Sequence, residues 1–393
     1  MEHTSLPLQL LSRDEAALRI SKVVAAMPDD VDALLVNDNA NLFYLTGRVF
    51  LGFVLICRDS SVKYFLRRPS VLEGDDIIPI HRPADIASHV ALNGLTVGLM
   101  EDEMPYSSLD RMAKALELTR YVNGSGCLRA ARAVKTPLEI RMMKDCGIKQ
   151  TQVYRHIPAL YREGMSDIEL QIEIEHALRS AGCLGQFRCS GAEMEIFMGN
   201  VITGDNADAP SPYDFAMGGA GLSPSLPVGA DGSIIKPGRP VMVDMNGNFN
   251  GYMTDMTRTF VAGDASDEIL RANDLSRAIC KAIAEAAVPG AECKALYAIA
   301  EDMVKAAGME SRFMGHTFHA GFVGHGLGIT INEPPVLAPR SRDILQAGNT
   351  IALEPKFVIP HVGAVGVENT YVVRADGAAE QITLAPEEII NLS

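Results

Sequence analysis

Four acidic residues lie inside apolar, strand-like runs in the second half of the sequence. They are Asp244, Asp255, Glu354 and Glu368. Asp and Glu are depleted in strands, and burying an unpaired carboxylate is strongly unfavourable. A chain that folds these runs into its core must therefore bring a common cation to the four acids. The pattern predicts a metal site built from β-structure.

The first two of these acids stand on the two arms of a predicted β-hairpin. Val241–Asp244 and Tyr252–Phe260 have strand composition, and the Asn- and Gly-rich residues between them are typical of a turn. A close connection would bring both carboxylates to one face, where they repel each other unless they are protonated or share cations. A single Asp in a strand is more often a surface residue or a turn cap, so the hairpin alone does not establish the site.

His325 adds a nitrogen ligand to the predicted set. It lies in the run Gly324–Gly328, whose glycines leave room around the imidazole. A glycine-flanked histidine is by itself more often structural, and the run lacks the Lys-Ser/Thr of a phosphate loop. Four carboxylates and one imidazole form a hard, oxygen-rich set. Such a set suits a pair of Mn²⁺, Co²⁺, Fe²⁺ or Zn²⁺ ions better than it suits Cys-rich chemistry.

The first third of the chain alternates short apolar runs with helical periods, which predicts an α/β unit with its own core. One predicted helix opens with the capping-box pair Ser12 and Glu15 and ends near Met27, and another spans Tyr106–Leu118. The predicted strands are Ala33–Val36, Asn41–Thr46, Phe53–Cys57, Val62–Leu66 and Thr96–Met100.

The rest of the chain has a different pattern. Pro137–Gly182 is helical in period and contains a second capping box, Ser166 with Glu169, whereas Cys183–Gly238 is rich in turn residues and predicts an ordered functional loop. Strands that carry carboxylates follow, together with helices at about Glu268–Ala287 and Cys293–Ala307. Because 393 residues exceed one ordinary core, we expect two domains, residues 1–127 and 128–393.

Charge and cysteine content limit the possible partners. The formal net charge of −14 argues against nucleic acid or an anionic membrane surface as partner. Seven dispersed cysteines without a CxxC pair suit reduced thiols in a reducing compartment. The first residues do not resemble a secretory signal, and no stretch reaches the roughly 20 apolar residues that span a bilayer. We therefore expect a cytoplasmic protein.

The five predicted ligands resemble, in their order and spacing, the ligand set of the pita-bread metallopeptidases. They are Asp244, Asp255 in T-D-M-T-R-T-F, His325 in G-H-G-L-G, Glu354 in L-E-P and Glu368 in G-V-E-N-T. That group includes methionine aminopeptidase, aminopeptidase P, prolidase and the metal-free relative creatinase. Two further segments, Asn41–Gly47 and Arg132–Met143, look like the N-terminal domain and the opening of the catalytic domain in the aminopeptidase P, prolidase and creatinase branch. The resemblance implies a creatinase-like α/β N-terminal domain followed by an α+β pita-bread catalytic domain.

The resemblance also implies roles for the ligands. Asp255 and Glu368 would bridge two divalent ions, Asp244 would complete one site, and His325 with Glu354 would complete the other. A bridging water between two cations loses a proton near neutral pH, and Glu354 would be the proton acceptor and shuttle. The implied activity is that of an exopeptidase on Xaa-Pro peptides, and the implied assembly is a homodimer.

Two neighbours of Asp255 in sequence, Thr257 and Arg258, have two readings. In the first reading, their side chains would bond to the metal ligands and hold them in place. In the second reading, Thr257 is a threonine on the face of a strand and Arg258 is a surface arginine. Lys356 follows Glu354-Pro355 at a position where the family often has Gly. We expect it to bring a charge near the mouth of the pocket.

The sequence departs from these peptidases at the substrate residues. They generally carry two further histidines, but this chain has none between His176 and His316, and Asn332 stands at the second position, before a retained Glu333. Gly366 stands where aminopeptidase P usually has an Arg. Tyr213, Asn332 and Glu333 are the candidate substrate-binding residues, and the nearby acids Asp205, Asp208 and Asp214, with His316, His319 and His361, are further candidates or simply structural residues.

These departures leave two alternatives to the peptidase reading. The first alternative is a non-peptidase metal enzyme, a hydrolase or lyase, that acts on a small molecule. The second alternative is a binding module that has lost catalysis. The complete ligand set argues against a lapsed module, because buried acids that need a metal have no use there. The expected partner is therefore a small peptide or a small molecule.

Overall fold

The computed structural model describes residues 6–189, 197–213 and 218–392. The chain divides into two compact units, Met1–Arg132 and Ala133–Ser393. The change in composition near Cys127 lies inside helix α4 (Ser125–Ala133), most of which belongs to the first unit. Among the described residues, we find no helix with the length and apolar character needed to cross a membrane.

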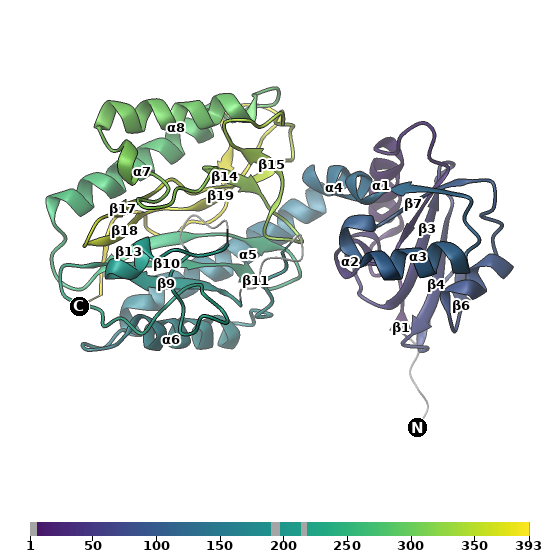
Figure 1. Ribbon diagram of the computed structural model, residues 1–393, viewed down its shortest axis with the longest axis horizontal. Coiled ribbons are helices and arrows are strands. Elements are labelled where there is room, and N and C mark those ends of the chain that lie inside the picture. Colours follow the sequence, from purple (N-terminus) through teal and green to yellow (C-terminus); the bar gives the residue numbers. More distant parts are fainter. Residues whose placement is uncertain (1–5, 190–196, 214–217, 393) are drawn as a thin grey trace. The chain divides into compact units, whose positions relative to one another are not determined.

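The first unit is a mixed six-stranded sheet with helices packed on it (Figure 1). The strand order is β6 (Ile77–Pro79), β4 (Val62–Arg68), β3 (Leu51–Cys57), β2 (Ala33–Val36), β7 (Thr96–Leu99) and β8 (Arg120–Asn123). A short pair, β1 (Leu6–Pro7) with β5 (Leu72–Glu73), lies outside this sheet. The helices are α1 (Arg13–Ala25), α2 (Asn39–Thr46), α3 (Tyr106–Ala115), α4 and the 3₁₀ turns η1 (Pro83–Ser88) and η2 (Glu101–Glu103). Central strands β2 and β7 are buried throughout, as the predicted α/β unit requires.

One predicted strand of this unit is wrong. Asn41–Thr46 belongs to helix α2. The Asp38 side chain accepts a hydrogen bond from the Asn41 N–H as an N-cap, and Gly47 ends the helix in the left-handed conformation at φ 73°. These two caps specify a helix. The apolar run between them is too short for its periodicity to distinguish a helix from a strand.

The second unit places its strands between two pairs of helices (Figure 1). A four-stranded sheet has the order β21 (Ile390–Asn391), β13 (Thr257–Val261), β10 (Pro240–Met245), β9 (Gly199–Thr203), and a five-stranded sheet has the order β15 (Glu333–Leu337), β14 (Gly324–Gly326), β16 (Thr350–Leu353), β19 (Asn369–Val372), β20 (Glu380–Gln381). Two short pairs complete it, β11 (Gly247–Asn248) with β12 (Met253–Thr254) and β17 (Lys356–Ile359) with β18 (Gly363–Gly366).

Each pair of helices closes one core of the second unit. The helices are α5 (Pro137–His156), α6 (Asp167–Ser180), α7 (Asp267–Ala286) and α8 (Cys293–Ala307), with 3₁₀ turns η3 (Ile157–Ala159), η4 (Gly204–Asp208) and η5 (Glu310–Arg312). Helices α5 and α6 pack Tyr154 and Ile174 against Val243, whereas α7 and α8 pack Ile283 and Leu296 against the C-terminal strands. The predicted capping box that starts α6 is confirmed, with Ser166 as N-cap.

The loop predicted over Cys183–Gly238 is wrong in part. Gly199–Thr203 forms strand β9, which is buried along its whole length and pairs with β10. Its apolar core is only Val201 and Ile202, and the Gly and Asn residues before them resemble turn material. Local composition did not indicate a strand here. The segment forms a strand because it is buried against β10.

Candidate metal centre

The five predicted ligands come from strands of both sheets and from the points where strands end. Asp244 is on β10, opposite Thr257 of β13. His325 is on β14, opposite Ala352 of β16. The other three lie just outside strands: Asp255 lies between β12 and β13, Glu354 follows β16, and Glu368 lies between β18 and β19.

The two glutamates sit where the chain changes sheets. β16 belongs to the five-stranded sheet and ends at Leu353, and after Glu354-Pro355 the chain continues as β17, which pairs only with β18 among the described strands. Glu368 occupies the matching step from β18 to β19. In a strand, successive side chains point to opposite faces of the sheet. A carboxylate at such a step lies outside a strand, so its direction is not set by this alternation. The strand-like run that carries Glu368 is therefore two strands, β18 and β19, with Glu368 in the break between them.

Three of the predicted ligands form a compact group. One ligand atom from each of Asp255, His325 and Glu368 lies within 4.8 Å of the other two. The Glu354 Oε1 atom lies 3.3 Å from His325 Nε2 and so joins the same side. Glu368 Oε1 is buried and has no hydrogen-bond partner among the described residues. A carboxylate oxygen in that condition is strongly unfavourable unless a cation neutralises it, so this donor set fits a divalent metal ion.

Lys356 is the unexpected member of the site. Its Nζ donates to Asp244 Oδ2 at 2.8 Å, to Glu354 Oε2 at 2.8 Å and to Glu368 Oε2 at 3.1 Å. The side chain is fully buried. The expectation that Lys356 lies near a pocket mouth is therefore wrong. Its ammonium is a member of the centre itself.

Buried side chains hold the ligands from behind. Thr257 Oγ1 donates to Glu368 Oε2 at 2.8 Å. Arg258 is fully buried, so its reading as a surface residue is wrong, and its Nη1 donates to the Glu368 carbonyl at 2.8 Å. Thr370 Oγ1 accepts from the Asp255 N–H at 2.8 Å. These contacts fix the backbone at two ligands.

Tyr154 is a supporting residue that the sequence did not reveal. Its hydroxyl accepts from the Met245 N–H at 3.0 Å and also contacts the Met256 carbonyl. From helix α5 it thereby joins the residue that follows Asp244 to the residue that follows Asp255. A buried tyrosine usually has such a partner, but a helical tyrosine in the sequence does not indicate which strands it joins.

The protein's own groups disfavour negative charge at two of the acids. Burial, reinforced by the charge of Asp244, raises the pKa of Asp255 to about 7. Burial also raises the pKa of Glu368 well above its ordinary value, and the charge of Asp255 adds to this effect. Both shifts have the cause expected of carboxylates crowded in a dry site. A divalent ion that binds here would have to displace these protons.

The opposite shifts occur at the pair formed by His325 and Glu354. Burial disfavours the charged imidazole, yet the hydrogen bond and charge of Glu354 outweigh it and raise the pKa of His325 to about 9. Burial likewise acts to raise the pKa of Glu354, but Lys356 and His325 outweigh it and lower that pKa to about 2. Glu354 therefore carries its negative charge at neutral pH.

The candidate substrate-binding residues have varied environments. Glu333 is buried, lies 3.3 Å from Lys135 Nζ, and accepts from the Thr330 N–H at 3.1 Å. The Asn332 carbonyl accepts from Thr330 Oγ1 at 3.4 Å. Tyr213 is half-buried and donates its N–H to Ser211 Oγ at 3.3 Å. No contact tests whether these residues bind substrate, so the three assignments stay predictions.

The remaining loop acids engage in local contacts. Asp208 accepts from the N–H and the hydroxyl of Thr317, at 2.8 and 2.7 Å. Asp205 lies 3.5 Å from His361, and both side chains are exposed. Asp214 lies outside the described residues. Asp208 thus joins η4 to the segment that follows η5.

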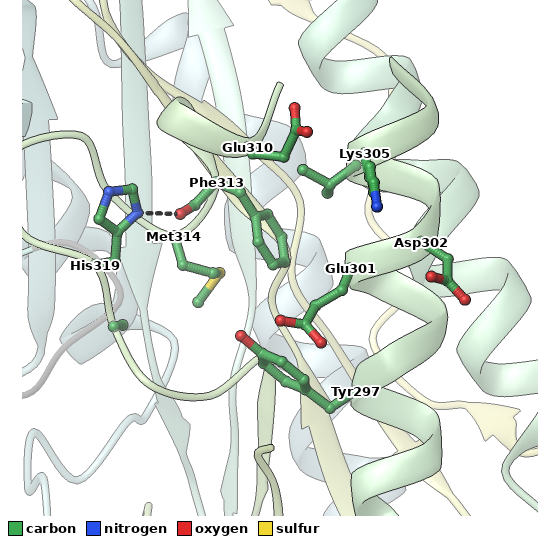
Figure 2. A pocket seen from close by; sticks show the side chains of 10 residues that line it. Tyr297, Glu301, Asp302, Lys305, Glu310, Phe313, Met314 and His319 are labelled. Carbon is green, nitrogen blue, oxygen red and sulfur yellow. Dashed lines mark hydrogen bonds between the residues drawn. The ribbon is translucent and has the colours of Figure 1, made fainter. Parts of the chain in front are cut away.

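A pocket lies beside helix α8, and its lining contains none of the five predicted ligands (Figure 2). It has a volume of about 480 Å³, and its walls include Tyr297, Glu301 and Lys305. His319 also lines this pocket, where its Nδ1 lies 2.7 Å from the Phe313 carbonyl. His316 has a similar contact with the Ser311 carbonyl at 2.9 Å. Both rings bond to nearby backbone, as expected of structural histidines.

Comparison with known proteins identifies relatives along almost the whole chain. It is 27% identical to an uncharacterized peptidase of Bacillus subtilis, over 92% of this chain and 96% of the relative. It is 24% identical to a Xaa-Pro dipeptidase of Pyrococcus horikoshii, over 95% of this chain and 98% of the relative.

Solved structures give the same fold. The Xaa-Pro dipeptidase from Bacillus anthracis matches with a TM-score of 0.79 at 24% identity, and the prolidase from Pyrococcus horikoshii matches with a TM-score of 0.77 at 20% identity. Each match covers 95% of this chain and 99% of the other. The predicted creatinase-like N-terminal domain followed by a pita-bread catalytic domain is thereby confirmed.

Family models divide the chain in the same way. The Creatinase/Prolidase N-terminal domain matches residues 19–134, and Metallopeptidase family M24 matches residues 141–375. The resemblance that the five ligand motifs indicated is thus confirmed over more than half of the chain. The protein belongs to metallopeptidase family M24.

Proposed function

We propose that this protein is a metal-dependent exopeptidase that removes the N-terminal residue from small peptides, with Xaa-Pro dipeptides as its first substrate class. The observation that carries the proposal is the group formed by Asp255, His325 and Glu368, with an unpartnered buried oxygen on Glu368. The relatives named Xaa-Pro dipeptidase support the substrate class. The small-molecule and binding-module alternatives have no comparable observation in their favour.

Asp255, His325, Glu354 and Glu368 would hold the metal. A divalent ion supplies Lewis acidity, which polarises a peptide carbonyl and lowers the pKa of a bound water. Asp255 and Glu368 contribute oxygens and His325 a nitrogen, a mixed set that suits Mn²⁺, Co²⁺, Fe²⁺ or Zn²⁺. On the resemblance alone the centre would hold two such ions, and Asp244 would complete the site of one of them.

Glu354 is the residue suited to move the proton. Its carboxylate is charged at neutral pH, because Lys356 and His325 lower its pKa to about 2, and its Oε1 lies 3.3 Å from His325 Nε2, beside the position proposed for the metal. Its two oxygens are directed apart, toward His325 and toward Lys356. Glu354 would then pass the proton to the leaving amine. Tyr213, Asn332 and Glu333 remain the proposed substrate contacts.

The proposed setting is a cytoplasmic homodimer. All seven cysteines are free, which suits a reducing compartment. The dimer rests on the resemblance alone, and light scattering after size-exclusion chromatography measures it directly. A monomeric mass would remove the dimer from the proposal without affecting the metal centre.

Metal-reconstituted turnover tests the proposed activity. Apoprotein is loaded separately with Mn²⁺, Co²⁺, Zn²⁺ or Fe²⁺ and given Xaa-Pro dipeptides, longer Xaa-Pro peptides and peptides without Pro. Wild type is compared with Glu354→Gln and with the control Glu301→Gln, which makes the same change at an exposed position. We expect release of the N-terminal residue, its loss in Glu354→Gln and its retention in the control. Absence of cleavage by a protein shown to contain metal would overturn the proposal.

A further inference from the structure

The side chain of Lys356 extends into the centre from a strand whose backbone is hydrogen-bonded on both sides. Its carbonyl accepts from the Met314 N–H at 2.8 Å, and its strand β17 pairs with β18 so that Lys356 lies opposite Gly366. A Cβ at residue 366 would lie 3.2 Å from Lys356 Cγ and 3.0 Å from its Cα. The absence of a side chain at Gly366 therefore makes room for the stem of Lys356. The lysine is fitted into the core of the unit.

The ammonium has as many acceptors as it has hydrogens. Asp244, Glu354 and Glu368 each offer one carboxylate oxygen, at 2.8, 2.8 and 3.1 Å from Nζ. A protonated lysine has three N–H donors and no acceptor. The three oxygens come from β10, from the step after β16 and from the step before β19. The ammonium thus has the surroundings of a cation in a carboxylate cage.

The two glutamates each divide their oxygens between two positions. Glu354 places Oε2 on Lys356 and Oε1 near His325, at 3.3 Å from its Nε2. Glu368 places Oε2 on Lys356, while Oε1 is buried without a partner among the described residues. Each carboxylate therefore bonds the ammonium through Oε2 and leaves Oε1 for another partner, and Glu368 also belongs to the group formed with Asp255 and His325. This is the geometry of a site for two cations, of which one position contains an ammonium.

Charge leads to the same result. The site contains four carboxylates, Asp244, Asp255, Glu354 and Glu368. One ammonium and one divalent ion bring three positive charges against these four negative ones. A second divalent ion would raise the positive charges to five in a buried site, and it would have to lie beside the ammonium or displace it. The ammonium and a second divalent ion would both be positive, and like charges that lie close together repel each other strongly in a buried site.

We propose that the Lys356 ammonium takes the place of one of the two cations, so that the protein binds a single divalent ion, at Asp255, His325, Glu354 and Glu368. Asp244 then serves as a partner of Lys356. This inference rests on the metal centre of the proposed function and does not depend on its substrate.

Metal stoichiometry tests the inference directly. Apoprotein is titrated with Mn²⁺ by calorimetry, and the bound metal is counted by elemental analysis after gel filtration. We expect one ion per chain in wild type and an electron paramagnetic resonance spectrum of an isolated Mn²⁺ ion. Two ions per wild-type chain, or a spectrum of a magnetically coupled pair, would overturn the inference.

Variants show whether Lys356 sets the number of ions. Lys356→Gly and Lys356→Met remove the ammonium, and we expect each to bind a second ion, with Asp244 as an added ligand. Lys356→Arg keeps the charge and should bind one ion. The matched control is Lys135→Met, which removes another buried lysine paired with a carboxylate, Glu333, and should leave the number unchanged. If the ammonium-free variants do not fold, the wild-type and Lys356→Arg counts still decide the question.

The outcomes separate this inference from the proposed function. One bound ion without cleavage of any peptide overturns the exopeptidase and leaves the inference standing. Two ions bound by wild type overturn the inference whether or not peptides are cleaved. One bound ion with cleavage supports both, and it makes a hydroxide held between two metal ions unnecessary for this chain.

Discussion

The guanidinium of Arg258 donates a hydrogen bond from Nη1 to the backbone carbonyl of Glu368 at 2.8 Å. The same side chain donates to the Ala385 carbonyl and to Asn369 Oδ1, each at 2.8 Å. A fully buried arginine thus joins strand β13 to the step that presents Glu368 and to the C-terminal segment. Its charge is used to fix backbone, because its acceptors are carbonyls and an amide.

Replacing Arg258 by Met should destabilise the protein. Several buried carbonyls lose a charged donor, which costs about 2–4 kcal/mol in the free energy of unfolding. Urea denaturation measures this change. The control is Arg374→Met, an exposed arginine next to Asp376, for which a change within about 0.5 kcal/mol is expected. Equal effects of the two substitutions would contradict the role given to Arg258.

Thr257→Val should weaken metal binding more than it weakens folding. The valine keeps the shape of the side chain but removes the hydroxyl that donates to Glu368 Oε2 at 2.8 Å. Loss of such support to a ligand lowers metal affinity by about 10-fold or more, as calorimetry would record. Thr259→Val is the matched control on the same strand, because that hydroxyl bonds to the Gly366 backbone. A similar loss of affinity in both variants would show that the effect is not specific to Glu368.

Asp167 should make the unfolding free energy depend on pH. Burial raises the pKa of Asp167 from 3.8 to about 6, despite backbone hydrogen bonds from Asp231 and Gly232 that lower it. Between these pH values the folded state binds more protons at this group than the unfolded state, so stability falls as pH rises from about 4 to 6. Above that range the contribution is constant.

Denaturation of wild type and Asp167→Asn at a series of pH values isolates this group. The other titrating groups cancel in the difference between the two proteins. We expect the variant to gain stability relative to wild type across that window and to change no further at neutral pH. A difference that does not vary with pH would rule out the raised pKa.

Metal binding should raise the melting temperature. An ion that binds only the folded protein adds stability that grows with its concentration, about 2.7 kcal/mol at 100 times its dissociation constant. Asp255→Asn, which removes a buried ligand oxygen, should abolish most of this increase. Asp208→Asn changes an acid that bonds to Thr317 and should retain it. Differential scanning fluorimetry with and without Mn²⁺ makes the comparison, and a rise in both variants would exclude Asp255 as a ligand.

The acids of the candidate site stand out in the sequence because they violate a local rule. Glu354 and Glu368 stand in apolar runs, and His325 among glycines, so each is unusual without any knowledge of the fold. Asn41–Thr46 shows the opposite case. Its helix is specified by Asp38 and Gly47, which lie outside the apolar run, and the run itself is too short to distinguish a helix from a strand.

The position of Lys356 could not be predicted in this way. A lysine after proline at the start of a strand is ordinarily exposed. Its burial follows from the change of sheet at Glu354-Pro355 and from the space left by Gly366. The contacts of Tyr154 depend likewise on the docking of α5 against β10 and against Met256, which precedes β13. Contacts of this kind arise from tertiary packing between segments far apart in the chain.

The ammonium of Lys356 has one property that no bound ion shares, because it cannot dissociate. Chelators, dilution or a cell poor in metal leave it in position, and Asp244, Glu354 and Glu368 keep a counter-charge throughout. The carboxylates can therefore come together during folding before any metal arrives. A newly made chain would wait for metal as a folded protein with a formed receptor, rather than as an open chain exposed to proteases.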